Sequence, residues 1–129
     1  MKIISIKITD YDCTIKWSTE NATTWSLTTD RKFSPEFGDA ISALGKVAAV
    51  RLSHDAELLS VRSVVISENS KGIAYVKLAG VLAGVSTDAT AKPGKFSTPK
   101  IEVDLFAKDE VRAMEKAAKQ YAKEAEGAA

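Results

Sequence analysis

The segment from Ser86 to Lys100 gathers residues that could bind an anion. Its hydroxyl groups and positive charges belong to Ser86, Thr87, Thr90, Ser97, Thr98, Lys92, Lys95 and Lys100. Asp88 is its single carboxylate, and Gly94 allows another backbone to come close. Hydroxyl and ammonium donors in one segment could grip phosphate oxygens. The same composition also suits an exposed hairpin tip without a ligand, so both interpretations stay open.

A second group of cations falls near the end of the chain at helical spacing. Its members, at steps of four, three and four, are Arg112, Lys116, Lys119 and Lys123. This spacing places them along one flank of a helix. Such a flank is usually a solvated face, and neighbouring glutamates dilute its charge. The sharper interpretation is an anion-binding edge.

Residues that commonly perform catalysis or hold metals are sparse. His54 is the single histidine and Cys13 the single cysteine, and the two are far apart in sequence. They give neither the ligand spacing of a zinc site nor a nucleophile with a recognisable general base. Asp10 and Asp12 could hold a cation, but closely spaced aspartates are common in turns. We therefore expect a protein that is not an enzyme and uses no metal or cofactor.

Composition places the chain among ordinary globular proteins. It has 129 residues, of which 45% are hydrophobic and 27% charged, and its formal net charge is +1. That balance disfavours a dedicated duplex-DNA binder, although a local basic patch remains compatible with it. No segment approaches the roughly 20 apolar residues of a membrane span. Lys2 and Lys7 interrupt the first apolar run, and one cysteine allows no internal disulfide, so we expect a cytoplasmic protein.

Alternating apolar and polar residues predict three strands in the first half of the chain. Their apolar residues are Ile4, Ile6 and Ile8, then Cys13, Ile15 and Trp17, then Trp25 and Leu27. The other face of these strands is rich in Thr, Ser and Lys. Trp17 and Trp25 could stack on bases, but they fit the alternation equally well, which favours core packing.

A helix follows, with Ser34 as its cap and Pro35 at its first position. It ends near residues 50–53, and its apolar face carries Phe37, Ile41, Leu44 and Ala48. Gly38 and Gly45 either weaken this helix or let another backbone approach it closely.

The second half repeats this order. Strands are expected around residues 61–66, 73–85 and 98–105, the last with Ile101, Val103 and Leu105 alternating. A final helix carries Val111, Met114, Ala118, Tyr121 and Ala125 on one stripe. The sequence therefore predicts an α+β fold of two βββα units, each an antiparallel sheet covered by one amphipathic helix. We expect residues 1–129 to form a single domain with halves of about 1–54 and 58–129, and the segment from Ser86 to Lys100 to be an insertion in the second half.

The chain resembles small proteins carried by tailed phages. The matching features are "KIISIKIT", "SPEFGDAISAL", "STPKI" and the terminal helix rich in Ala, Lys and Glu. Among these proteins it resembles the anti-defence sponge family, which blocks Thoeris immunity by sequestering cyclic ADP-ribose-type signals. The resemblance implies a compact oligomer that binds a nucleotide at a subunit interface, without cleaving it, in the cytoplasm of an infected bacterium. It also implies Arg62, Arg112 and the loop from Thr90 to Thr98 as contacts.

Three functions are compatible with these features. The first is sequestration of a small anionic ligand of the nucleotide-signal class by a homo-oligomer. The second is single-stranded nucleic-acid binding in phage recombination or replication, which the near-neutral charge disfavours. The third is inhibition of a host protein, or a clamp-like ring subunit. The candidate ligand-binding residues are Arg62, Thr90, Lys92, Lys95, Ser97, Thr98, Lys100, Arg112 and Lys116.

Overall fold

The computed structural model describes residues 2–52, 59–82 and 94–127. Its strands are β1 (Lys2–Ile8), β2 (Cys13–Ser18), β3 (Thr24–Thr29), β4 (Leu59–Glu68), β5 (Ala74–Leu82), β6 (Gly94–Ser97) and β7 (Ile101–Glu102). Its helices are α1 (Pro35–Leu52), α2 (Val103–Phe106) and α3 (Lys108–Gly127). The strands form one antiparallel sheet in the order β3-β2-β1-β4-β5-β6, and β7 also pairs with β5. The predicted α+β class is confirmed.

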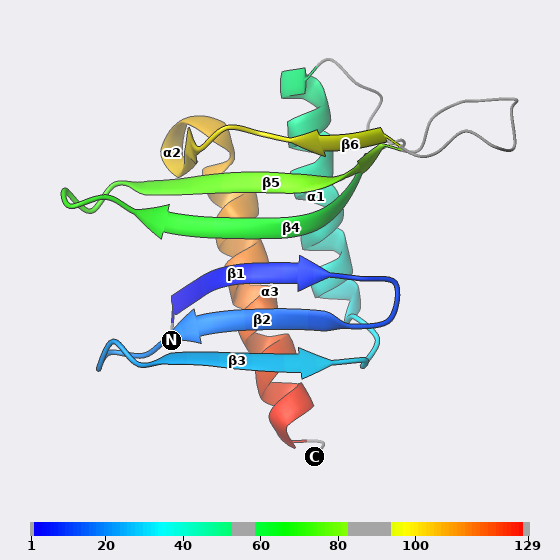
Figure 1. The fold of residues 1–129 in the computed structure, drawn as a ribbon, viewed down its shortest axis with the longest axis vertical. Helices are drawn as coiled ribbons and strands as arrows, with labels where there is room; N and C mark the ends of the chain where they lie inside the picture. The colour runs from blue at the N-terminus through cyan, green and yellow to red at the C-terminus, as the bar shows by residue number, and fades with distance from the viewer. Residues whose placement is uncertain (1, 53–58, 83–93, 128–129) are drawn as a thin grey trace, which may run out of the picture.

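The two expected sheets are instead joined into one. Strands β1 and β4 pair directly through Ser5 with Val65, Ile6 with Val64, and Lys7 with Ser63. Helices α1 and α3 run antiparallel to each other behind the sheet and across its strands (Figure 1).

Helix length explains why each helix covers more than its own half. At 1.5 Å per residue, the 18 residues of α1 and 20 of α3 extend about 27 and 30 Å. Six strands spaced by about 4.8 Å extend about 24 Å from the first to the last. A helix that lies across the strands therefore spans both halves of the sheet.

Strand β1 departs from simple alternation. Ile3 and Ile6 are fully buried, whereas Ile4 is only half-buried. The β1–β2 register shifts between Ile3 and Ser5, so Ile4 is the extra residue of a β-bulge. The expectation that Ile4 lies on the core face was therefore wrong, because the bulge resets the alternation within the strand.

The predicted apolar faces of the long helices are confirmed. On α1 the Ser34 hydroxyl accepts a hydrogen bond from the Phe37 N–H at 3.3 Å, as expected of a cap. The buried side chains of the two helices include Phe37, Ile41, Leu44, Ala48, Val111, Met114, Ala118 and Tyr121. Together with the inner sheet face they form one hydrophobic core.

The predicted sixth strand over residues 98–105 was wrong. Strand β6 lies earlier, in the expected loop, and only Ile101–Glu102 pairs afterwards as β7. The chain then turns into α2, which buries Val103 and Phe106 and leaves Leu105 71% exposed. The buried residues Val103 and Phe106 are three positions apart, as in a helix, so Leu105 does not share a buried face with Val103 as a strand would require.

Turn chemistry accounts for the β4–β5 hairpin. The Asn69 side chain accepts hydrogen bonds from the N–H groups of Lys71 and Ile73 at 2.9 and 3.0 Å. Gly72 has φ of +79°, a conformation that glycine adopts without steric cost.

Within the described ranges, no helix is both long and apolar enough to cross a membrane.

Candidate functional site

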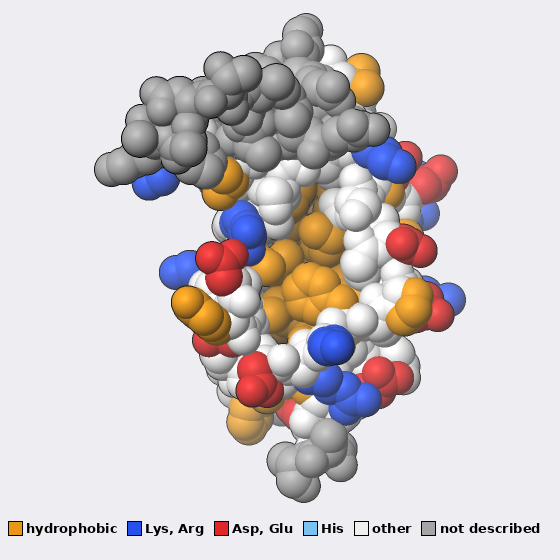
Figure 2. Space-filling model, turned by 90° about the vertical axis from the view of Figure 1, so that its right-hand side faces the viewer, with side chains coloured by type: hydrophobic (Ala, Val, Ile, Leu, Met, Phe, Trp, Pro, Cys, Tyr) orange, Lys and Arg blue, Asp and Glu red, His pale blue; other side chains and the backbone are white. Residues whose placement is uncertain are grey.

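A cleft opens where β1 ends beside the first residues of β4. The β1–β4 pairing stops at Lys7 and Ser63, while β4 continues back to Leu59 along α1. The space between these elements has a volume of about 300 Å³. Figure 2 looks onto this end of the molecule and shows a hollow with apolar side chains at its floor.

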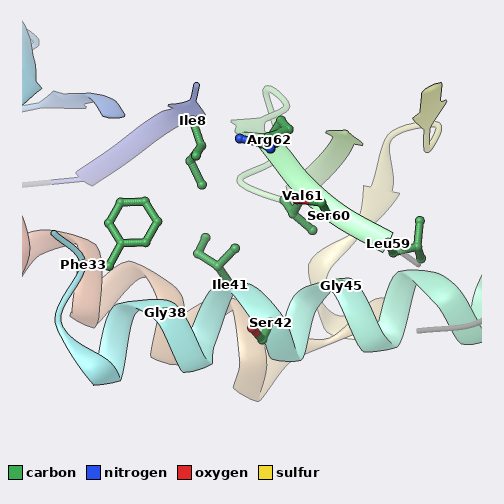
Figure 3. Close-up of a pocket in the computed structure, with 10 residues that line it drawn as sticks. All are labelled: Ile8, Phe33, Gly38, Ile41, Ser42, Gly45, Leu59, Ser60, Val61 and Arg62. Atoms are coloured by element: carbon green, nitrogen blue, oxygen red, sulfur yellow. The ribbon is translucent and has the colours of Figure 1, made fainter. Parts of the chain in front are cut away.

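Three apolar side chains from separate elements point into this cleft. Ile8 extends from the end of β1, Ile41 from α1, and Phe33 from the segment before α1 (Figure 3). Leu59 and Val61 of β4 complete the apolar lining. The cleft therefore needs the correct docking of α1 against the sheet.

Neighbouring rings hold Phe33 in place. Its ring centroid lies 4.7 Å from that of Phe37 and 5.5 Å from that of Tyr121, the latter in an edge-to-face arrangement. The Tyr121 hydroxyl donates a hydrogen bond to the backbone carbonyl of Arg31. This bond fixes the ring that supports Phe33, so the aromatic wall is preformed.

Two glycines leave room on the helical side. Gly38 and Gly45 line the cleft at positions seven residues apart on α1. A Cβ atom at Gly38 would meet nothing within 4 Å, whereas one at Gly45 would lie 3.4 Å from Cγ2 of Val61. A Cβ atom at Gly45 would therefore make only an ordinary contact with β4, whereas Gly38 keeps part of the cleft open.

Arg62 supplies a positive charge to the cleft. It is the extra residue of a β-bulge between Val61 and Ser63 in the β4–β5 register. Its side chain is 35% exposed and forms an ion pair with Asp10 at 3.1 Å, and the Asp10 side chain is 76% exposed. Because exposed ion pairs contribute little to stability, an anionic ligand could displace Asp10 at small cost.

The other candidate ligand-binding residues lie elsewhere. Lys95 and Ser97 are exposed on β6, and Lys100 lies in a separate hollow beside the β4–β5 turn. Arg112 and Lys116 are exposed on α3, and Lys116 also lines a groove between α3 and the start of α1. The structure therefore does not bring these residues together with Arg62.

Thr98 is 3% exposed, and its hydroxyl accepts a hydrogen bond from the Leu78 N–H at 3.0 Å, so it has a structural role. Thr90 and Lys92 lie outside the described residues.

Sequence reasoning did not identify the apolar lining of the cleft. The alternation over residues 4–9 places Ile8 on the core face, and no sequence pattern singles out Phe33. The available signal was the pair Gly38 and Gly45, whose spacing of seven residues places both on one side of a helix. That signal suggested close approach of another backbone, but a Cβ atom at Gly45 would lie 3.8 Å from the Leu59 carbonyl oxygen, an ordinary contact, and one at Gly38 would meet no backbone within 4 Å.

The sheet face opposite the helices is a second candidate surface. Four exposed lysines project from it: Lys7, Lys16, Lys77 and Lys95. Ser5 pairs with Lys16 on one side and with Val65 on the other. Val65 in turn pairs with Lys77, so two lysines share one row across four strands. The register places one carboxylate of the described strands, Glu102, at the margin of this face.

The tryptophans are not part of that lysine face. Trp17 and Trp25 pair across β2 and β3 on the side of the helices. Trp17 is buried in the core, whereas Trp25 is 53% exposed because β3 is the outermost strand.

Cys13 is buried in the core, and Asp12 belongs to the β1–β2 turn. Burial raises the pKa of the Cys13 thiol to about 12, so the thiol is unreactive at neutral pH. Asp12 accepts a hydrogen bond from the Thr9 hydroxyl at 2.8 Å within the β1–β2 turn. Across the residues that the structure describes, no three His, Cys, Asp or Glu side chains cluster as metal ligands would.

Comparisons with known proteins returned no relatives: no family model, curated protein or solved structure matches this chain. Functional inference therefore rests on the geometry of the cleft and of the lysine-bearing sheet face.

Proposed function

We propose that this protein is a non-enzymatic binding protein that holds a small anionic ligand with an aromatic or apolar part. The observation that carries the proposal is the half-buried guanidinium of Arg62 beside a preformed apolar cleft of about 300 Å³. Ligand sites typically combine an apolar lining of this size with a few polar groups that fix orientation. Here Ser42 and Ser60 supply additional hydroxyl groups.

Binding without turnover is supported by the chemistry of the lining. The described residues that line the cleft include no His, Asp, Glu, Cys, Lys or Tyr side chain. A general acid or base would normally come from one of these types. A guanidinium offers five N–H donors and no acceptor, so Arg62 suits anion binding rather than proton transfer.

A nucleotide fits this combination of groups. The Phe33 ring offers an apolar surface for a base, and Arg62 offers paired donors for a phosphate. The resemblance to phage sponge proteins narrows the proposal to a cyclic ADP-ribose-type immune signal, sequestered in the cytoplasm of an infected bacterium. On this proposal the ligand leaves the protein chemically unchanged.

Ligand-induced stabilisation tests the proposal. Cyclic ADP-ribose, ADP-ribose, AMP and inorganic phosphate would be added separately to the wild type, Arg62→Ala and Arg112→Ala, and Tm measured. Arg112→Ala is the matched control, because it removes the same charge from an exposed position on α3.

We expect at least one nucleotide to raise Tm of the wild type and of Arg112→Ala but not of Arg62→Ala. Chromatography of the released ligand should return it intact. No shift with any nucleotide, or equal shifts in both variants, would contradict the cleft as the site.

A second candidate function is binding of single-stranded nucleic acid on the lysine-bearing sheet face. The observation that favours it is the row of paired residues that joins Lys16 to Lys77. The described strands place four lysines on this face and one carboxylate, that of Glu102, at its margin. Such a face could follow a phosphate backbone, and its binding should weaken steeply with salt. The double variant Lys16→Glu/Lys77→Glu should abolish oligonucleotide binding at low salt, whereas Arg62→Ala should retain it.

A further inference from the structure

Strand β3 forms an unprotected edge of the sheet. Its sequence, TWSLTT, contains no charged residue, proline or glycine. It pairs with β2 through six consecutive residue pairs without a bulge, and no described strand lies beyond it. Exposed sheet edges are normally protected by charges, prolines or bulges, because their free backbone groups attract another strand.

The turn before β3 determines which backbone groups are free. The Thr19 N–H donates to the Thr23 carbonyl at 3.0 Å, next to the pair formed by Ser18 and Thr24. Hydrogen-bonded and non-hydrogen-bonded pairs alternate along an antiparallel ladder. The backbone N–H and C=O groups of Trp25 therefore bond to β2, whereas those of Thr24 point outward.

By the same alternation, the backbone groups of Leu27 bond to β2, whereas those of Ser26 and Thr28 point outward. The hydroxyls of Thr14 and Thr28 lie 2.8 Å apart, which fits a non-hydrogen-bonded pair, where side chains approach most closely. The free edge therefore presents the N–H and C=O groups of Thr24, Ser26 and Thr28.

We infer that β3 pairs antiparallel with β3 of a second copy of this chain, with Ser26 opposite Ser26 on the two-fold axis. In this register Thr24 of each copy lies opposite Thr28 of the other, so all outward-facing groups are matched. A shift by two residues in either direction leaves one of the three outward-facing residues opposite a position outside the partner's β3. The geometry of the edge therefore favours a single register.

Side chains are complementary in the same register. Trp25 of each copy lies opposite Leu27 of the other, on the helix side of the sheet, in non-hydrogen-bonded pairs where side chains are closest. Trp25 is 53% exposed and Leu27 half-buried in the single chain, so pairing would cover apolar surface. No like charges meet across the axis, because β3 carries none.

Helix α3 also extends to this edge. Its C-terminal turns continue past β3 in Figure 1, so an added strand would lie beneath helix on one face. The resulting dimer has one sheet continuous through both copies, with an isologous interface. The interface is separate from the Arg62 cleft, so its existence does not depend on the proposed ligand.

Disulfide trapping tests both the dimer and its register. Ser26→Cys places two thiols opposite each other. Their Cα atoms would be about 5.5 Å apart, which is within the Cα–Cα range of a disulfide. Thr28→Cys is the matched control on the same edge and face, because its thiol would lie opposite Thr24 and more than about 10 Å from its symmetry mate. Cys13, the only native cysteine, is buried and should not react.

Under mild oxidation we expect Ser26→Cys to form a covalent dimer and Thr28→Cys to stay unlinked on non-reducing gels. Light scattering of the wild type at micromolar concentration should give twice the 13.8 kDa mass of one chain. Ser26→Lys should halve that mass with an unchanged circular dichroism spectrum, since it places two charges together on the axis.

A monomeric wild type would overturn the inference. So would a dimer that Ser26→Lys leaves intact, or equal crosslinking of the two cysteine variants, since either result places the contact elsewhere.

Discussion

Thr98 and Leu78 exchange two hydrogen bonds, one through the backbone of Thr98 and one through its side chain. The Thr98 N–H donates to the Leu78 carbonyl at 2.8 Å, and the Leu78 N–H donates to the Thr98 hydroxyl at 3.0 Å. The hydroxyl occupies the position that a strand carbonyl would fill in a regular ladder. The backbone can therefore leave β5 at Pro99 without exposing a buried N–H group, which explains where β6 ends.

Replacing Thr98 by Val should destabilise the protein. The Leu78 N–H would be buried without an acceptor, at a cost of about 1–3 kcal/mol. Urea unfolding followed by circular dichroism measures this loss. Thr98→Ser keeps the hydroxyl and should retain most of the stability, whereas a loss in Thr98→Ser as large as that in Thr98→Val would show that the methyl group contributes as much as the hydroxyl.

Gly38→Ala should have opposite effects on stability and on ligand binding. Alanine in a helix is more stable than glycine by up to about 1 kcal/mol, and its methyl group has space here. That methyl group would occupy the cleft, so Tm without ligand should rise while the ligand-induced shift falls. Asp39→Ala, an exposed neighbour on α1, provides the control with an unaltered cleft.

Gly80→Ala should be strongly destabilising. A Cβ atom at Gly80 would lie 2.0 Å from the Ser60 carbonyl oxygen and 2.8 Å from Cε1 of Phe96. Strands β4 and β6 would have to separate from β5, at a cost of about 3 kcal/mol, the upper end of the usual range for overpacking. Thermal unfolding would show the loss, and Ala79→Ser on the opposite face should change Tm little. A stable Gly80→Ala variant would show that β4 can move at its bulge.

Glu115 should make stability depend on pH in the acidic range. Burial raises the pKa of its carboxyl above the ordinary 4.5, despite the opposing charges of Lys119, Lys2 and Arg112. The folded state thus favours the protonated form, so this contribution is complete below pH 4.5 and is lost as pH rises through the folded pKa. Glu115→Gln should therefore be more stable than wild type at pH 7, and the difference should vanish below pH 4.5. Glu126→Gln at the exposed end of α3 controls for net charge.

Local patterns predicted the elements whose side chains follow one period. Ser34 and Pro35 marked the start of α1, and alternation in β2 identified Cys13 and Ile15 as core residues. The pattern failed where backbone hydrogen bonding interrupts it. The bulge at Ile4 and the reciprocal bonds of Thr98 both depend on a partner strand, which the local sequence does not specify.

The candidate site was less predictable for a related reason. Arg62 was implied as a contact, but its environment is created by the end of β1, the start of β4 and one side of α1. These segments are far apart in sequence, and no short motif indicates that they lie together in the fold. The scattered positions of Lys95, Lys100 and Arg112 show the same limit, since spacing along the chain does not indicate which face of the sheet a residue joins.

The short central ladder has a consequence for how the protein unfolds. Only three residue pairs join β1 to β4, yet both long helices lie across that junction. Neither half of the sheet keeps its apolar cover if the helices detach, so the halves should lose structure together. Amides at the centre and in the inner strands should therefore exchange with solvent at similar rates, as one cooperative unit.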